Sequence, residues 1–189
     1  ISPDSDTLIY TLAGVNDPER GWGRADETWH THSTLGQLGI ENWFQIGDKD
    51  LALHLFRNEQ RKKGLSLTEI TQHIAQKFGV NSCILPMSDD PVQTIIESDI
   101  GHLSFQEYFV KHQSEPCIRN ISFNGSTEAS LSPELKTVIR DNGFKAIIIC
   151  PSNPYLSIDP ILSIKEIKSF IESASIPVVA VSPIVGGKA

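Results

Sequence analysis

The sequence predicts an α/β fold, a Rossmann-like three-layer arrangement with a mostly parallel sheet and an inserted β-hairpin and helical subregion. Residues 145–150 form an aliphatic run that stops at the polar turn Pro151-Ser152-Asn153-Pro154, as a buried strand does before a loop. Asp159-Pro160 then predicts a helix start, and residues 161–174 repeat apolar side chains at helical spacing. Residues 177–181 form a second buried strand. This order favours a right-handed parallel crossover, with ligands at the carboxyl ends of the strands.

The amino-terminal part of the chain is predicted to be mainly helical. Residues 66–69 read Ser-Leu-Thr-Glu, a capping box that predicts a helix start. Residues 42–48 are predicted to be a brief extended segment. Helices are expected from Ser5 or Asp6 to Gly14, over residues 27–38, from residue 51 to Gly64, and from Ser66 to Gly79.

The middle of the chain is predicted to contain the inserted subregion, residues 82–123. Residues 92–97 and 103–110 flank a turn and predict a hairpin. Strands are also expected at residues 83–85 and 118–123, and a helix over residues 131–142. We expect one α/β domain over residues 1–189, incomplete at both ends.

Composition limits the classes of partner. The chain has 189 residues, 16 basic and 23 acidic, and a formal charge of −7, which disfavours nucleic acid and anionic membrane surfaces. The sequence has no apolar run long enough to span a membrane and no signal-peptide pattern at its start. We therefore expect a cytoplasmic protein with small-molecule substrates. The three cysteines, without a Cys-x-x-Cys pair, are expected to be reduced thiols within apolar strands.

Paired carboxylates in turns are the first candidates for chemistry. They are Asp4 with Asp6, Asp48 with Asp50, and Asp89 with Asp90. Short Asp-x-Asp spacings can aim two carboxylates at one hard cation such as Mg²⁺. Aspartate is also a common helix cap and turn residue, and for any one pair we favour capping by roughly three to one.

Polar residues after the first predicted carboxy-terminal strand are the second candidates. Ser152, Asn153 and Ser157 lie where a strand leads into a helix, a position that favours a phosphate or carboxylate. The loop lacks glycines, so a phosphate site and an ordinary connecting loop are about equally favoured. Residues 185–188, Val-Gly-Gly-Lys, lack the spacing of a P-loop and predict a plain turn. Trp22 is equally compatible with stacking on a planar ligand and with filling the core.

Seven short motifs follow one another along nearly the whole chain. They are residues 2–7 (SPDSDT), 21–23 (GWG), 47–52 (GDKDLA), 85–92 (LPMSDDPV), 105–109 (FQEYF), 151–158 (PSNP followed by Ser157-Ile158) and 179–184 (VAVSPI). In this order they resemble the motifs of the 2-phospho-L-lactate transferase family of deazaflavin coenzyme biosynthesis, the CofD/FbiA-like enzymes. The resemblance covers an internal fragment of that family, whose glycine-rich nucleotide loop precedes the part that matches.

That resemblance implies a magnesium-dependent transferase. The ribityl hydroxyl of the precursor 7,8-didemethyl-8-hydroxy-5-deazariboflavin attacks a phosphoryl group of a guanosine diphosphate ester of lactate or enolpyruvate. The reaction releases GMP and belongs to coenzyme F-420 biosynthesis. Phosphoryl transfer depends on positioning and charge neutralisation and needs no covalent nucleophile. The resemblance also suggests a homodimer.

By the resemblance, Asp6 is the catalytic residue, and Asp6 and Asp4 are the metal ligands. Gln45 stands where the family often has a basic residue, Lys49 where arginine is usual, and Asp159 where glycine is common. Lysine keeps the charge of arginine without its bidentate geometry. The implied substrate-binding residues are Asp4, Asp6, Thr7, Trp22, Gln45, Gly47, Asp48, Ser88, Asp89, Ser152, Asn153, Ser157 and Ser182.

Two alternatives stand beside this reading. One is a non-catalytic regulator of the same superfamily that binds a nucleotide sugar and resembles the gluconeogenesis-factor proteins. The other is a structural remnant without a ligand. Because the family's nucleotide loop lies outside the matching part, we expect the 189-residue chain itself to have little transferase activity.

Overall fold

A computed structural model of the chain describes residues 2–141 and 143–184. The turn predicted at residues 185–188 lies outside the described residues. The chain divides into two compact units, Ile1–Pro86 and Met87–Ala189, and each is described here by itself. Whether the two units form the single predicted domain stays a prediction.

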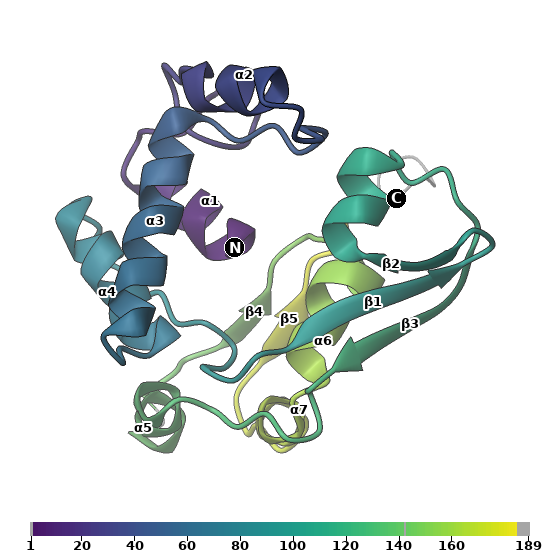
Figure 1. The fold of residues 1–189 in the computed structure, drawn as a ribbon. Coiled ribbons are helices and arrows are strands. Elements are labelled where there is room, and N and C mark those ends of the chain that lie inside the picture. Colours follow the sequence, from purple (N-terminus) through teal and green to yellow (C-terminus); the bar gives the residue numbers. More distant parts are fainter. Residues whose placement is uncertain (1, 142, 185–189) are drawn as a thin grey trace. The chain divides into compact units, whose positions relative to one another are not determined.

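The first unit is helical (Figure 1). Its helices are α1 (Pro3–Leu12), α2 (His30–Gln37), α3 (Asp48–Lys62) and α4 (Leu67–Lys77). The core is made of buried apolar side chains from α1, α4 and the segment after α4: Ile9, Tyr10, Ile70, Ile74, Ala75 and Ile84. This core fixes the start of the chain against α4.

Two helix starts show how local chemistry decides the boundaries. The capping box at Ser66 is confirmed, since Ser66 Oγ accepts from the Glu69 N–H and Glu69 Oε2 accepts from the Ser66 N–H. The first helix starts earlier than predicted. Its N-cap is Ser2, and Pro3 takes the first helical position that proline favours. The prediction of a cap at Ser5 or Asp6 was therefore wrong.

Two other predictions in the first unit were also wrong. The second helix begins at His30 rather than residue 27, because Thr28 stays outside it and its carbonyl accepts the Asp48 N–H at 2.9 Å. Residues 83–85 form no strand, since this segment has no neighbouring strand to pair with in the described chain. The burial of Ile84 in the helical core explains its apolar character.

The second unit contains a three-stranded antiparallel sheet in the order β2-β1-β3 (Figure 1). The strands are β1 (Gln93–Ser98), β2 (Gly101–Ser104) and β3 (Ile118–Asn124). The predicted hairpin and the strand at residues 118–123 are confirmed. The second hairpin strand ends early because the chain turns helical at residue 105, before the π-helix η1 (Glu107–Lys111), where Ser104 Oγ accepts the Glu107 N–H and the Glu107 carboxylate accepts the Ser104 N–H.

A parallel pair of strands, β4 (Ile147–Ile149) and β5 (Val178–Ala180), confirms the predicted parallel pairing. The helix predicted over residues 161–174 is broken into α6 (Asp159–Leu162) and α7 (Lys165–Glu172), and the π-helix η2 (Pro154–Ile158) precedes them. Asn153, not Asp159, is the capping residue, because its Oδ1 accepts the N–H groups of Tyr155 and Leu156. The remaining helix is α5 (Pro133–Asp141).

The α/β class is confirmed, and the Rossmann-like arrangement is confirmed in part, by one parallel pair connected through helices. Two expectations about burial were wrong. The carboxy-terminal strands are not fully buried, since Ile148 is 64% exposed and Val179 is 51% exposed. All three cysteines are exposed free thiols, because they lie in loops or next to strand ends instead of inside a core.

Candidate functional site

Helix α1, the loop at Gly23 and the start of α3 meet at Asp50. Tyr10 Oη, on α1, donates a hydrogen bond of 2.6 Å to Asp50 Oδ1. Gly23 lies beside the same carboxylate, since a Cβ atom added to Gly23 would be 3.7 Å from Asp50 Oδ2. Asp50 itself belongs to the first turn of α3. Helix α1, which includes residues 3–7, the loop at Gly23 and the start of α3 are far apart in sequence, and they lie around one carboxylate.

Asp6 is buried and forms an ion pair with Arg57 of α3, from Nη2 to Oδ1. The other terminal nitrogen of Arg57, Nη1, lies 3.2 Å from His54 Nδ1. An arginine can only donate, so His54 Nδ1 accepts and its ring carries its proton on Nε2. Burial and the Arg57 charge lower the pKa of His54 to about 4, in agreement with a neutral ring. Asp6, Arg57 and His54 thus form one connected chain of contacts.

The charge of Asp6 depends on opposing effects. Burial raises the pKa of Asp6 to about 6, although the Arg57 guanidinium acts in the opposite direction. The nearby Asp50 carboxylate raises the pKa further. We expect Asp6 to be ionised at neutral pH, because the guanidinium of a buried arginine keeps its charge and needs a counter-ion.

The two predicted metal ligands do not converge on one point. Asp4 and Asp6 are two residues apart within α1, so they project roughly 200° apart around the helix. Asp4 is exposed, whereas Asp6 is buried against Arg57. Among the described residues, no group of three or more histidine, cysteine, aspartate or glutamate side chains is placed to hold a metal ion. As arranged here, this pair does not fit a shared Mg²⁺ site.

Asp48 caps the start of α2, and Glu27 caps the start of α3. The Asp48 carboxylate accepts from Thr28 Oγ1 at 2.5 Å and from the N–H groups of His30 and Thr31 at 3.0 Å, at the start of α2. The Glu27 carboxylate accepts the N–H groups of Lys49 and Asp50 at the start of α3. These bonds hold the pKa of Asp48 well below its usual range, with the Thr28 hydroxyl as the largest cause. The interpretation of Asp48 as a helix-capping residue is therefore confirmed.

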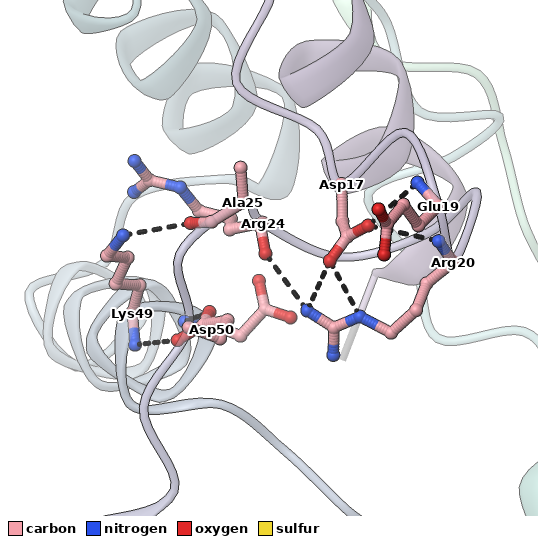
Figure 2. A network of polar contacts seen from close by, with 8 residues as sticks. Asp17, Glu19, Arg20, Arg24, Ala25, Lys49 and Asp50 are labelled. Atoms are coloured by element: carbon pink, nitrogen blue, oxygen red, sulfur yellow. Dashed lines mark hydrogen bonds and ion pairs between the residues drawn. The ribbon is translucent and has the colours of Figure 1, made fainter.

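A network of polar contacts fixes the loop that carries Trp22 (Figure 2). Arg20 donates from Nε to Asp17 Oδ2 at 2.8 Å and from Nη2 to the Arg24 carbonyl at 3.3 Å. The Arg20 guanidinium also lies 5.3 Å from the ring centre of Trp22 and 5.2 Å from that of Trp29. Trp22 keeps 49% of its surface exposed. A fixed, half-exposed indole is suited to stacking on a planar ligand.

Other predicted residues of the first unit lie around this network. Lys49 donates from Nζ to the Ala25 carbonyl at 2.8 Å, as Figure 2 shows. Its ammonium group is therefore held by the backbone of the loop. Gly47 is buried beneath Glu27. Gln45 is exposed in the segment before α3, and Thr7 is half-buried on α1.

In the second unit, the predicted residues Ser88 and Asp89 belong to a turn. Ser88 is buried, donates from Oγ to the Ser130 carbonyl at 2.6 Å and accepts the Asp90 N–H. Asp90 in turn accepts from the Ser130 N–H and hydroxyl. These bonds tie the turn to the segment before α5, so Ser88 has a structural function in this arrangement. Asp89 is half-buried.

The remaining predicted residues share one edge of the parallel pair. Strands β4 and β5 run in the same direction, and the Val181 N–H donates to the Ile149 carbonyl at 3.0 Å. Ser152 and Asn153 follow β4, and Ser182 follows β5, so their carboxyl-end positions coincide. Ser157 lies in η2. Asn153 also lines a hollow of about 200 Å³ with Tyr108 and Tyr155.

Four residues of the first unit were not identified from the sequence: Tyr10, Glu27, His54 and Arg57. The sequence did contain an indication of Arg57. It follows Asp50 by seven residues, or two helical turns, so both residues lie on the same face of α3. Glu27 lies outside any helix and had no comparable signal. The predicted site residues are divided between the two units, Ile1–Pro86 and Met87–Ala189.

Comparisons with known proteins give a consistent result. The family model described as 2-phospho-L-lactate transferase CofD matches residues 1–189. The 2-phospho-L-lactate transferase of Methanosarcina mazei is 39% identical over 186 residues, and the phosphoenolpyruvate transferase of Mycobacterium avium is 37% identical over 195 residues. These alignments cover 98% and 100% of this chain but 60% and 57% of the two relatives.

A solved structure supports the fold. The crystal structure of a UPF0052 family protein from Bacillus halodurans matches with a TM-score of 0.59 at 14% identity, over 92% of this chain and 51% of that one. At this identity the match concerns the fold alone. None of the helices in the described part of the chain is long and apolar enough to cross a membrane.

Proposed function

The chain belongs to the 2-phospho-L-lactate transferase CofD family, and on this premise we propose that it is part of a phospholactate-type transferase. The proposed reaction moves a phospholactyl or phosphoenolpyruvyl group from a guanosine diphosphate ester to the ribityl hydroxyl of 7,8-didemethyl-8-hydroxy-5-deazariboflavin and releases GMP, as in coenzyme F-420 biosynthesis. The chain spans about 60% of the length of its curated relatives, so this activity is proposed for the whole protein.

One observation carries the proposal beyond family membership. Tyr10 of α1, the helix that includes residues 3–7, donates a hydrogen bond to Asp50 of the motif at residues 47–52, and Gly23 of the motif at residues 21–23 approaches the same carboxylate. A ligand site is built from polar groups that converge from separate segments of the chain, so this arrangement supports a ligand site in the first unit.

Different residues of the chain are suited to contact different parts of the substrates. Asp6, held by Arg57, offers a fixed carboxylate that can accept a hydrogen bond from the ribityl hydroxyl. Trp22 offers a half-exposed ring for the planar deazaflavin. Ser152, Asn153 and Ser182 offer polar groups at one sheet edge to the donor phosphates.

Two further parts of the proposal rest on the resemblance. These are dependence on Mg²⁺ and a homodimeric state, whereas the cytoplasmic location is proposed from the sequence pattern. Asp4 and Asp6 do not converge, so this pair as arranged does not hold the metal.

The test is a fluorescence titration of the 189-residue chain with the deazaflavin precursor, repeated with GDP and with or without Mg²⁺. We expect the precursor to bind and GDP to strengthen its binding when Mg²⁺ is present. A matched series with a uridine diphosphate sugar distinguishes the regulator, which would prefer that ligand. Absence of binding to any of them would contradict a ligand site in this chain. Turnover of the guanosine diphosphate ester by the chain should be weak.

A further inference from the structure

Arg57 is a buried cation in a small helical unit. It is 5% exposed, and its Nε has no hydrogen-bond partner among the described residues. Its terminal nitrogens contact Asp6 on α1 and His54 one helical turn earlier on α3. An ion pair buried in this way often adds little stability compared with an apolar pair of the same size. Stability alone is therefore a weak reason for this arrangement.

The two terminal nitrogens of the Arg57 guanidinium contact different side chains. Nη2 holds one carboxylate oxygen of Asp6, and Nη1 is held by the neutral His54 ring. His54 lies three residues before Arg57, so both project from the same face of α3. A guanidinium is planar, so fixing one terminal nitrogen restricts the direction of the other. His54 thus restrains the orientation of Arg57, and Arg57 restrains that of Asp6.

We propose that Arg57 is a positioning residue for the Asp6 carboxylate and that His54 orients Arg57 for this task. The inference rests on the proposed function, in which Asp6 contacts the deazaflavin precursor. Arg57 acts only through Asp6 and is not itself a catalytic residue. Binding of the precursor therefore depends on a hydrogen-bond acceptor at position 54, which lies two contacts away from the ligand.

The test compares precursor binding by fluorescence for two substitutions at position 54. His54→Leu removes the acceptor, and His54→Gln retains one. We expect His54→Leu to weaken precursor binding at least threefold and His54→Gln to restore it to within twofold of the wild type. Arg57→Met should weaken binding about tenfold to a hundredfold, since it removes a charged hydrogen bond. Arg57→Lys should lie between Arg57→Met and the wild type.

Arg61→Met is the matched control, because Arg61 is exposed on the same helix and should bind the precursor as the wild type does. Urea unfolding of each variant separates folding from binding. Equal weakening by His54→Leu and His54→Gln, or a folded Arg57→Met that binds as the wild type does, would overturn the proposal.

Failure of the wild-type chain to bind the precursor would instead count against the proposed function. The Arg57–His54 contact is then tested without ligand by ¹⁵N NMR of the imidazole. We expect an Nε2–H tautomer with Nδ1 as acceptor, and a shift of the Nδ1 signal in Arg57→Met. An unchanged Nδ1 signal would remove His54 from the positioning chain.

Discussion

Glu27 places its carboxyl group where the side chain of any residue other than glycine at position 47 would begin. A Cβ atom added to Gly47 would collide with Glu27 Cδ and Cγ. From that place the Glu27 carboxylate accepts the N–H groups of Lys49 and Asp50, which have no partner within α3. Gly47 therefore leaves the space that the Glu27 side chain occupies. Glu27 in turn caps the helix that begins directly after Gly47.

Gly47→Ala should lower the free energy of unfolding by about 1–3 kcal/mol, because Glu27 must leave the start of α3. The backbone at Gly47 is extended, with φ −73° and ψ 158°, so alanine meets no conformational penalty there. The cost is therefore steric. Urea unfolding measures it, with Gly143→Ala as the control, since no atom lies within 4 Å of a Cβ at Gly143.

A double-mutant cycle identifies the cause. In a Glu27→Ala background the carboxyl group is gone, and Gly47→Ala should cost much less than in the wild type. Additive costs would show that Gly47 matters for a reason unrelated to Glu27.

Asp48 should make the chain sensitive to acid. Its folded-state pKa is depressed by the Thr28 hydroxyl first and then by the Thr31 amide and side chain. A depressed carboxylate pKa contributes stability that is present above the unfolded value, about 4, and is lost as the pH falls below it. Asp48→Asn should therefore be less stable than the wild type at pH 7, and the difference should shrink below about pH 4.

Thr28→Val, which removes the strongest bond to Asp48, should reproduce part of this pH dependence. Urea unfolding at a series of pH values measures both variants. A difference between Asp48→Asn and the wild type that stays constant from pH 7 to pH 3 would show that the capping bonds do not stabilise the charged form.

Tyr10→Phe tests the contact that joins α1 to Asp50. The hydrogen bond from Tyr10 to a carboxylate is partly buried, and its loss should lower the free energy of unfolding by about 1.5–3 kcal/mol. Burial, and after it the same bond, raises the pKa of Tyr10 above its ordinary value. Tyr155→Phe is the control, because Tyr155 is 66% exposed and should change stability by less than about 0.5 kcal/mol. Equal effects would mean that Asp50 finds another partner.

Sequence reasoning succeeded where a short pattern contains both partners of an interaction. Ser66 and Glu69 cap each other within four residues, and the predicted start of α4 is confirmed. The same signature at Ser104 and Glu107 was hidden by aromatic residues that favour strands, so η1 was predicted as part of a strand. At Ser104 the capping interaction, and not the strand preference of the aromatic residues, determines the local structure.

The contacts of the candidate site connect residues that are far apart in sequence. Asp6 meets Arg57 across 51 positions, and Tyr10 meets Asp50 across 40. Without the helix packing of the first unit, no spacing rule brings these pairs together. The Asp-x-Asp pattern at Asp4 predicted a shared metal site only while these residues were taken as a turn. Once Pro3 extends the helix, the two carboxylates separate.

Asn153→Asp tests the proposed donor side of the site. Aspartate retains the oxygen that caps η2, so the fold should be preserved. The added negative charge lies at the edge shared by Ser152 and Ser182 and should repel a phosphate there. At about 4 Å in water this repulsion is about 1 kcal/mol, so GDP should bind at least fivefold more weakly, as measured by calorimetry. Asn124→Asp adds the same charge on the exposed end of β3 and should leave GDP binding unchanged. Equal GDP affinity in Asn153→Asp and the wild type would place the donor phosphates away from this edge.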